Sequence, residues 1–233
     1  MSDAPIPSAP RETYFVVVNG QMNPAIHHPQ WYRHIGAIDE AELQASLPIQ
    51  TNSTSPVLSQ VQFGSPALTV VCQPENWWIQ SNDAQTWARM MDITALVFAK
   101  LNETPVNAYG FTSQVHIETV APDTKSVLAD SIWGLKLGFP EASRKSTASN
   151  VTLSVVEEDA VITASLQPSL LSERAIFVFL NAQYPAPRGT TLGYFDLGVL
   201  LKGRFEKYLR VEEAIRADML ANVNSRAEQK GES

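Results

Sequence analysis

The sequence contains one cysteine, Cys72, and no long hydrophobic run. A single thiol excludes an internal disulfide and any zinc site built from several cysteines. Because no window approaches 18 consecutive apolar residues, we expect no membrane-spanning helix. The first twelve residues, MSDAPIPSAPRE, also lack the basic start and the apolar stretch of a signal peptide. We therefore expect a cytoplasmic protein.

Basic residues are scarce as well. The chain has 17 Lys and Arg against 24 Asp and Glu, which gives a net charge of −7. A surface that neutralises phosphates should be basic at least in patches, and no run of Lys and Arg occurs. We therefore expect no nucleic-acid partner. With 233 residues, of which 44% are apolar, the chain is globular and large enough to bury a core without a metal.

Catalytic motifs are missing too. The sequence has no Gly-x-Ser-x-Gly elbow, no phosphate-binding glycine-rich loop with lysine, no Gly-x-Gly-x-x-Gly and no His-Glu-x-x-His. We therefore predict no catalytic residues, no metal site and no cofactor. A triad assembled only by folding is the alternative.

Short runs rich in β-branched and aromatic residues alternate with amphipathic stretches. Strands are predicted at 13–18, 57–63, 67–73, 77–81, 106–119, 151–156, 160–166 and 175–182, and helices at 39–47, 83–103, 125–137 and 196–222. Because strands come in runs before helices, we expect an α+β fold, an antiparallel sheet with long amphipathic helices on one side.

The same reading divides the chain into three parts. Residues 1–12 form an extended tail, 13–222 a single α+β domain, and 223–233 a polar C-terminal tail. Within the domain, residues 13–139 and 150–222 are two loosely similar halves, since each places antiparallel strands before a long helix. Residues 140–149, which are polar and turn-rich, would link them.

The last helix carries an apolar seam with 4-3 spacing from Leu201 to Met219, interrupted by Glu212. Such a seam either packs on the chain's own sheet or forms a dimer contact of the coiled-coil type. Phe205 and Tyr208, in the middle of the seam, are therefore candidate partner-binding residues.

Four segments resemble an uncharacterised bacterial family that is sporadically distributed and occurs in mobile-element and defence-type gene neighbourhoods. They are the hairpin at Gln62–Pro66, the helix containing Trp87, the segment Glu103–Phe111 and the closing helix near Phe205. The resemblance covers about residues 57–220. It implies a bacterial or phage accessory protein, and it supplies neither an activity nor catalytic residues.

Three of the four histidines, His27, His28 and His34, lie within eight residues beside Trp31 and Tyr32. Such a segment could supply a metal ligand or a general base. Neighbouring histidines in an extended chain point to opposite sides, however, and no cysteine or acid lies close by. The alternatives are a loop anchored in the fold by the two aromatic residues and a loop that binds a partner.

The fourth histidine, His116, lies on the polar face of the 106–119 strand between Gln114 and Glu118. Neighbours on one face of a strand are about 6.5–7 Å apart, which is too far for a direct hydrogen bond without side-chain reach. A solvated or interface position is one interpretation. The other is a hydrolase in which His116 joins the histidine segment.

Trp77 and Trp78 are adjacent, so a strand sends their rings to opposite faces. One ring should enter the core, and the other could anchor a contact. The alternatives are that both rings are covered within the fold, or that a small-ligand pocket lies under Trp77 or Trp133.

We therefore predict a non-catalytic interaction or assembly protein that associates with itself or another protein through its sheet edge, Trp78 or the last helix. The alternatives are a hydrolase-type enzyme that uses the His27/His28/His34 loop with His116, and a small-ligand-binding domain. The candidate partner-binding residues are Trp31, Tyr32, His34, Trp78, Phe205 and Tyr208.

Overall fold

A computed structural model gives the arrangement of most of the chain. It describes residues 12–46, 53–63, 68–121, 123–125, 127–128, 150–157, 160–187 and 196–231. Among these residues, no helix combines the length and the apolar character needed to cross a membrane. The predicted linker 140–149, most of the helix expected at 125–137, and Trp133 lie outside the described residues.

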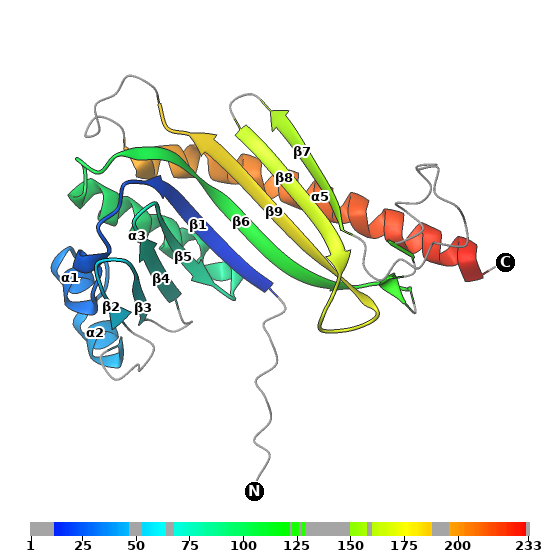
Figure 1. Ribbon diagram of the computed structural model, residues 1–233, viewed down its shortest axis with the longest axis horizontal. Coiled ribbons are helices and arrows are strands. Elements are labelled where there is room, and N and C mark those ends of the chain that lie inside the picture. The colour runs from blue at the N-terminus through cyan, green and yellow to red at the C-terminus, as the bar shows by residue number, and fades with distance from the viewer. Residues whose placement is uncertain are drawn as a thin grey trace, which may run out of the picture.

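A nine-stranded antiparallel sheet forms one layer of the molecule, in the order β2-β3-β4-β5-β1-β6-β9-β8-β7 (Figure 1). The strands are β1 (Glu12–Gly20), β2 (Ser53–Thr54), β3 (Ser59–Phe63), β4 (Leu68–Gln73), β5 (Asn76–Ser81), β6 (Val106–Glu118), β7 (Val151–Glu157), β8 (Ala160–Pro168) and β9 (Ala175–Pro185). The α+β class predicted from the sequence is therefore confirmed.

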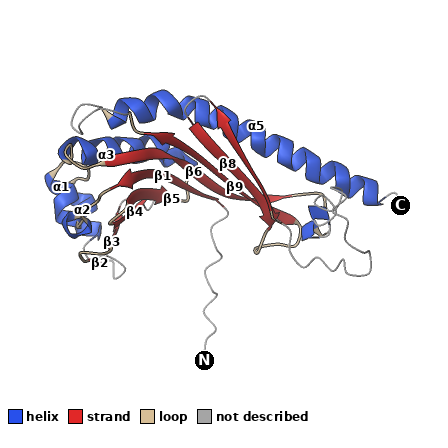
Figure 2. Cartoon of the chain, turned by 45° about the horizontal axis from the view of Figure 1, so that its top comes forward, coloured by secondary structure: helices blue, strands red, loops and turns tan. Residues whose placement is uncertain are grey.

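The helices form the second layer, on one face of this sheet (Figure 2). They are η1 (Pro24–Ile26), α1 (Pro29–His34), α2 (Glu40–Ser46), η2 (Ala84–Thr86), α3 (Trp87–Lys100) and α5 (Leu197–Gly231). The two long helices, α3 and α5, pack against each other as well as on the central strands. The opposite face of the sheet has no helix over it among the described residues, and we call it the open face.

The order of elements repeats along the chain. A central strand, a three-stranded meander and a long helix occur first as β1, β3–β5 and α3, and then as β6, β7–β9 and α5. The two central strands pair antiparallel in the middle of the sheet, with Val16 opposite Phe111. In the part of the chain that the structure describes, the repeat therefore divides between α3 and β6.

One main core joins the two halves. Trp87 of α3 has ring contacts with Tyr14, Phe111, Phe205 and Tyr208, at centroid distances of 5.2 to 5.9 Å. A second, smaller cluster lies under the C-terminal part of α5 and packs Val223 against residues of β8 and β9. Together, the two clusters fasten α5 along much of its length.

The apolar seam of α5 faces its own sheet. Leu201 and Tyr208 are fully buried, and Phe205 packs at 5.5 Å from Phe111. Glu212, which interrupts the seam, is buried too and accepts a hydrogen bond from Arg216 one turn later. The seam was interpreted either as a surface that packs on the chain's own sheet or as a dimer contact. The structure shows that it packs on the chain's own sheet.

Three local differences from the sequence analysis have simple causes. The helix α5 continues to Gly231 instead of ending at Asn222. No proline or glycine lies between these two residues, and Val223 packs in the second core cluster. Residues 22–36, for which the sequence predicted no helix or strand, contain η1 and α1, which begin at Pro24 and Pro29. Each begins at a proline, a residue that the first position of a helix favours. The polar segment 49–56 contains the two-residue strand β2.

Candidate binding face

The two faces of the sheet differ sharply in chemistry. On β1, the alternate residues Tyr14, Val16 and Val18 are buried under the helices, while Phe15 and Val17 lie half-buried on the open face. The same alternation continues on β8, where Ile162 and Ala164 are buried beneath the helical layer. A strand sends successive side chains to opposite faces, so the register of the sheet tells which residues share the open face.

The open-face positions from β3 to β7 contain no Lys, Arg, Asp or Glu within the described residues, except Glu118 at the end of β6. Their polar members are Gln60, Gln62, Thr69, Gln73, Asn76, Gln80, Thr13, Asn19, Thr112, Gln114, His116, Asn181, Gln183, Thr163, Ser165, Gln167, Thr152 and Ser154. Their apolar members include Phe15, Val17, Val71, Trp78, Phe177, Phe179, Val161 and Val156.

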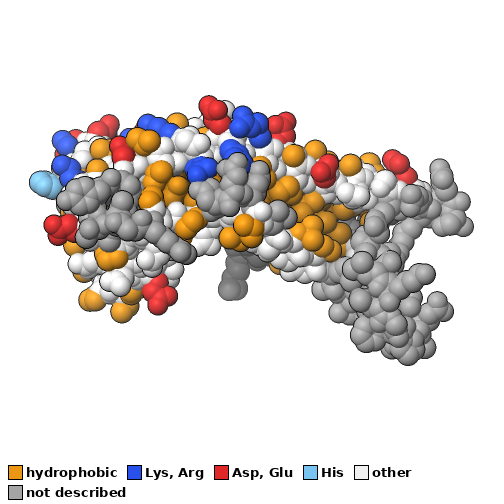
Figure 3. Space-filling model, turned by 90° about the horizontal axis from the view of Figure 1, so that it is seen from above, with side chains coloured by type: hydrophobic (Ala, Val, Ile, Leu, Met, Phe, Trp, Pro, Cys, Tyr) orange, Lys and Arg blue, Asp and Glu red, His pale blue; other side chains and the backbone are white. Residues whose placement is uncertain are grey.

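Charged side chains gather elsewhere on the molecule. In Figure 3 the helical layer lies along the upper border and carries most of the red and blue side chains, whereas the side toward the open face is mainly white and orange. Since charged residues make up 18% of the chain, a face of this size without them is a distinctive surface. It matches the depletion of charge found at the centres of protein interfaces.

A hollow of about 430 Å³ lies near the middle of the open face. Four strands line it, β4, β5, β1 and β6. Its lining residues are Phe15, Val17, Asn19, Gln73, Asn76, Trp78, Gln80, Thr112 and Gln114. The hollow therefore combines two aromatic rings with amide and hydroxyl groups, which can both donate and accept hydrogen bonds.

Trp78 is the largest side chain of this hollow. It lies beside Val17 on β1 and Val71 on β4, and its Nε1 donates to Gln80 Oε1 at 3.1 Å. The ring is half-buried, so its position is set by neighbours while part of its surface stays accessible. Asn76 lies two residues before Trp78 on β5, and its buried Oδ1 has no hydrogen-bond partner among the described residues.

Gly110 lies directly beside Val17 on the open face. A Cβ atom at this position would come within 2.1 Å of the Ala182 carbonyl oxygen on β9, so no larger residue fits without moving the backbone. The glycine thus lets β6 and β9 approach closely at the centre of the sheet.

The histidine segment has a structural role in the fold. The buried His27 ring forms a hydrogen bond of 2.8 Å with the hydroxyl of Tyr32, which also accepts one from Trp77 Nε1 at 3.3 Å. The carbonyl of His27 accepts hydrogen bonds from Ser59 and Thr54. Burial lowers the pKa of His27 to about 4, and the charge of its neighbour His28 adds to this effect. This histidine therefore stays neutral near pH 7.

The other members of the segment do not converge on His27. The side chain of His28 accepts a hydrogen bond from the backbone N–H of Trp31 and so caps the start of α1. His34 is exposed at the end of that helix, and Trp31 is half-buried, with its ring edge-on to His27 at 5.1 Å. The segment therefore fixes α1 to the sheet, and the interpretation as an anchored loop describes its observed contacts.

His116 lies far along the sheet from this segment. It follows Val115, which pairs with Glu12 at the start of β1, whereas the histidine segment follows Gly20 at the end of β1. Its Nδ1 is 2.8 Å from Ser169 Oγ, its ring packs on Phe177 at 4.8 Å, and burial lowers its pKa. The four histidines therefore do not form one site.

The remaining predicted residues separate by burial. Tyr32 and Tyr208 are buried in the core, whereas Phe205 is partly buried and packs between α3 and the sheet. Trp77 is fully buried, with its ring packed edge-on against Phe98. In the part of the chain that the structure describes, no three His, Cys, Asp or Glu residues are grouped so as to hold a metal ion.

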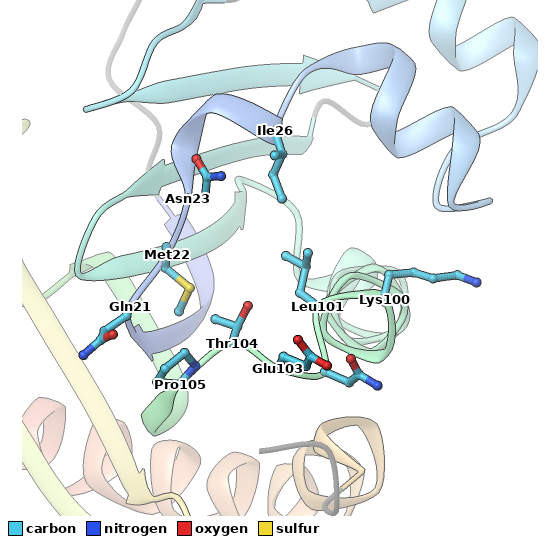
Figure 4. Close-up of a pocket in the computed structure, with 10 residues that line it drawn as sticks. Gln21, Met22, Asn23, Ile26, Lys100, Leu101, Glu103, Thr104 and Pro105 are labelled. Atoms are coloured by element: carbon cyan, nitrogen blue, oxygen red, sulfur yellow. The ribbon is translucent and has the colours of Figure 1, made fainter. Parts of the chain in front are cut away.

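Two other hollows have less favourable linings. The first, of about 370 Å³, lies where the chain after β1 meets the end of α3, and Lys100 extends away from Met22 and Thr104 there (Figure 4). The second lies between α1, α2 and α3, where Arg89 is paired with Glu42 at 3.1 Å. Neither lining combines aromatic rings with amide groups, as that of the open-face hollow does.

Trp78 was predicted from the sequence as a partner-binding residue, whereas the other residues of the open face were not. Phe15 and Val17 lie in an apolar run in which both faces of β1 look alike, so the pattern does not reveal which residues are buried. One signal was available. The polar positions of the predicted strands are Gln, Asn, Ser and Thr almost throughout, while the charges lie in helices and turns.

Compared with known proteins, the chain matches no protein-family model and no curated protein sequence.

Proposed function

We propose that this chain is a non-catalytic binding or assembly protein that holds a protein partner on the open face of its sheet, around Phe15 and Trp78. The observation that carries the proposal is that the described residues of this face between β3 and β7 carry no charge apart from Glu118. A partner that covers the face desolvates no ion pair, so burial of the aromatic rings stabilises the complex.

The chemistry of the face also indicates what the partner must offer. The hollow presents amide groups from Gln73, Asn76 and Gln114 beside Phe15 and Trp78. A complementary surface is uncharged, with apolar side chains for the rings and backbone or side-chain groups for the amides. A phosphate-bearing partner is disfavoured, because the face contains no Lys or Arg among its described residues.

The hydrolase alternative receives no support from the geometry. A general base must lie within hydrogen-bond reach of the group that it activates. His27 is buried against Tyr32, and His116 lies at the other end of β1. A small-ligand function is the second use of the same hollow, and its specific observation is that Phe15 and Trp78 lie there beside the amide groups of Gln73 and Gln114.

Site-specific photo-crosslinking in the native host tests the proposal. A photoreactive phenylalanine analogue at Phe15 should capture one specific protein, which mass spectrometry identifies. The matched control is the same analogue at Leu170, which is 97% exposed and lies outside the open face. Capture from Phe15 but not from Leu170 supports the proposal. Equal capture from both positions, or none from Phe15, contradicts it.

Binding of the captured partner should then depend on Trp78. Trp78→Ala removes a half-buried ring at the centre of the hollow and should weaken the complex by about tenfold or more, as aromatic anchors do. Leu170→Ala should leave affinity unchanged. Titration calorimetry measures both, and circular dichroism checks that the variants fold.

The bacterial resemblance of the segments around Gln62–Pro66 and Glu103–Phe111 belongs to this proposal. An accessory protein of a mobile or defence-type locus, located in the cytoplasm, would find its partner among the products of neighbouring genes. Those products are the first proteins to test for capture at Phe15.

A further inference from the structure

The two edges of the sheet are unequal. At one end, β2 is only two residues long and is followed by β3, which contacts α2. At the other end, β7 pairs with β8 over seven residues, Val151–Glu157, and no described residue pairs with its outer side. The outer backbone groups of such a strand are a template for another strand.

Apart from Glu157 at its last position, β7 lacks the residues that usually protect an edge strand. Lysine, proline or a bulge normally prevents edge strands from pairing. The segment 151–156 contains no charged residue and no proline, and its pairing with β8 is regular. Val156 is 75% exposed on the open face, and Leu153 is 58% exposed on the opposite side. A further strand paired with the outer side of β7 would bury part of the exposed surface of both side chains.

We propose that the chain forms a homodimer in which β7 pairs antiparallel with β7 of a second copy. A second copy fits because the segment 151–156 is uncharged, so two such strands meet without repulsion although each chain carries a net charge of −7. Isologous pairing also covers Leu153 and Val156 of both copies at once. This inference concerns the edge of the sheet and does not depend on the function proposed for the open face.

Symmetry restricts the register of this contact. Antiparallel pairing about a two-fold axis keeps each side chain on its own face, so one residue must lie opposite its own copy. Ser154 is the middle of Val151–Glu157, and centring on it pairs all seven residues. Thr152 then lies opposite Val156 of the second copy on the open face. The dimer has one sheet with both open faces on the same side.

The chain already contains a contact of the same kind. Its two halves join through antiparallel pairing of the equivalent strands β1 and β6, with both helical layers on one side. The β7 contact would repeat this arrangement between copies. Because it involves a single strand from each chain, we expect a concentration-dependent dimer of modest affinity and not an obligate one.

Disulfide trapping tests the register directly. Directly opposed residues of an antiparallel pair have Cα atoms about 4.5–5.5 Å apart, which a disulfide can span. Ser154→Cys should therefore give a covalent dimer under mild oxidation. The native Cys72 should not interfere, because it is buried and burial raises its pKa to about 12. The control is Val199→Cys on α5, where the valine is 65% exposed.

Light scattering coupled to size exclusion tests the edge without cross-linking. The wild-type chain should shift from monomer to dimer as its concentration rises, and Val156→Lys should raise the dissociation constant at least tenfold, as a protective edge lysine does. Val199→Lys should leave it unchanged. A wild-type monomer at every concentration, or Ser154→Cys that cross-links no more than Val199→Cys, overturns the proposal. A dimer weakened by Trp78→Ala but not by Val156→Lys overturns it as well, and places self-association on the open face.

Discussion

The adjacent residues Trp77 and Trp78 lie on opposite faces of the sheet and have different roles. Trp77 is completely buried against Phe98, whereas Trp78, next in sequence, lies half-buried in the open-face hollow. The two positions therefore respond differently to truncation. Loss of Trp77 leaves a cavity in the core and destabilises the fold, while loss of Trp78 mainly removes contact area from the proposed binding face.

His27 should make stability depend on pH. Its pKa is lowered from 6.5 to about 4 in the folded chain, so between these values the unfolded chain binds a proton that the folded chain does not. Stability is therefore fully present above pH 6.5 and falls as the pH drops toward 4, by about 3 kcal/mol from this residue. Urea unfolding at pH 7 and pH 4.5 should show the loss.

The matched variant separates this histidine from the carboxylates, which also titrate at low pH. His27→Gln cannot take up a proton, so its unfolding free energy should fall less between the two pH values than that of the wild type. His34→Gln is the control, because His34 is exposed at the end of α1. An equal pH dependence of wild type and His27→Gln would refute the assignment.

At the scale of elements, α5 holds the molecule together. Its N-terminal part is capped by Asp196, whose carboxylate accepts from the backbone N–H of Val199 at 3.1 Å. Its middle packs Tyr208 on the central strands, and its end packs Val223 in the second cluster. Glu212 and Arg216, one turn apart on the same helix, form an ion pair between the middle and the end.

The C-terminal part of α5 should contribute measurably to stability. Val223 is 2% exposed, and Val223→Ala should lower the free energy of unfolding by about 2 kcal/mol through lost burial and a residual cavity. Val199→Ala, on the exposed side of the same helix, should change it by less than about 0.5 kcal/mol. Chemical denaturation measures both. If the two variants are equally stable, the end of α5 does not pack as described.

At the scale of the whole molecule, the two repeated halves depend on each other. The β1–β6 pair runs from Glu12 opposite Val115 to Gly20 opposite Val106. The main core contains residues of both halves, among them Trp87 from the first and Tyr208 from the second. Separating the halves would expose this core and leave both central strands as open edges.

We therefore expect one cooperative unfolding transition. Fragments 1–104 and 105–233, which divide the chain between α3 and β6, should each lack a cooperative thermal transition by circular dichroism. Mixing or co-expressing them should restore it, because β1 and β6 can then pair. A fragment that melts cooperatively alone would show that the halves are independent domains.

Local patterns in the sequence determined the class of the fold and most of its elements. The strands at β3–β6 and the helix α3 were predicted within a few residues, since alternation and helical spacing are local properties. The adjacent tryptophans were also assigned correctly to opposite faces. The C-terminal end of α5 and the short helices η1 and α1 were not predicted. Long-range contacts stabilise them, since Val223 of α5 packs in the second core cluster and Tyr32 of α1 accepts a hydrogen bond from Trp77.

Tertiary structure alone decided which face of each strand is covered and which strands lie together. In β1 both faces are apolar, so only the packing of α3 and α5 leaves Phe15 and Val17 on the open side. The pairing of β6 with β9, about 70 residues apart, joins the uncharged positions of separate strands into one surface. Such long-range pairing leaves no local pattern in a sequence, and it is what creates both the open face and the free edge at β7.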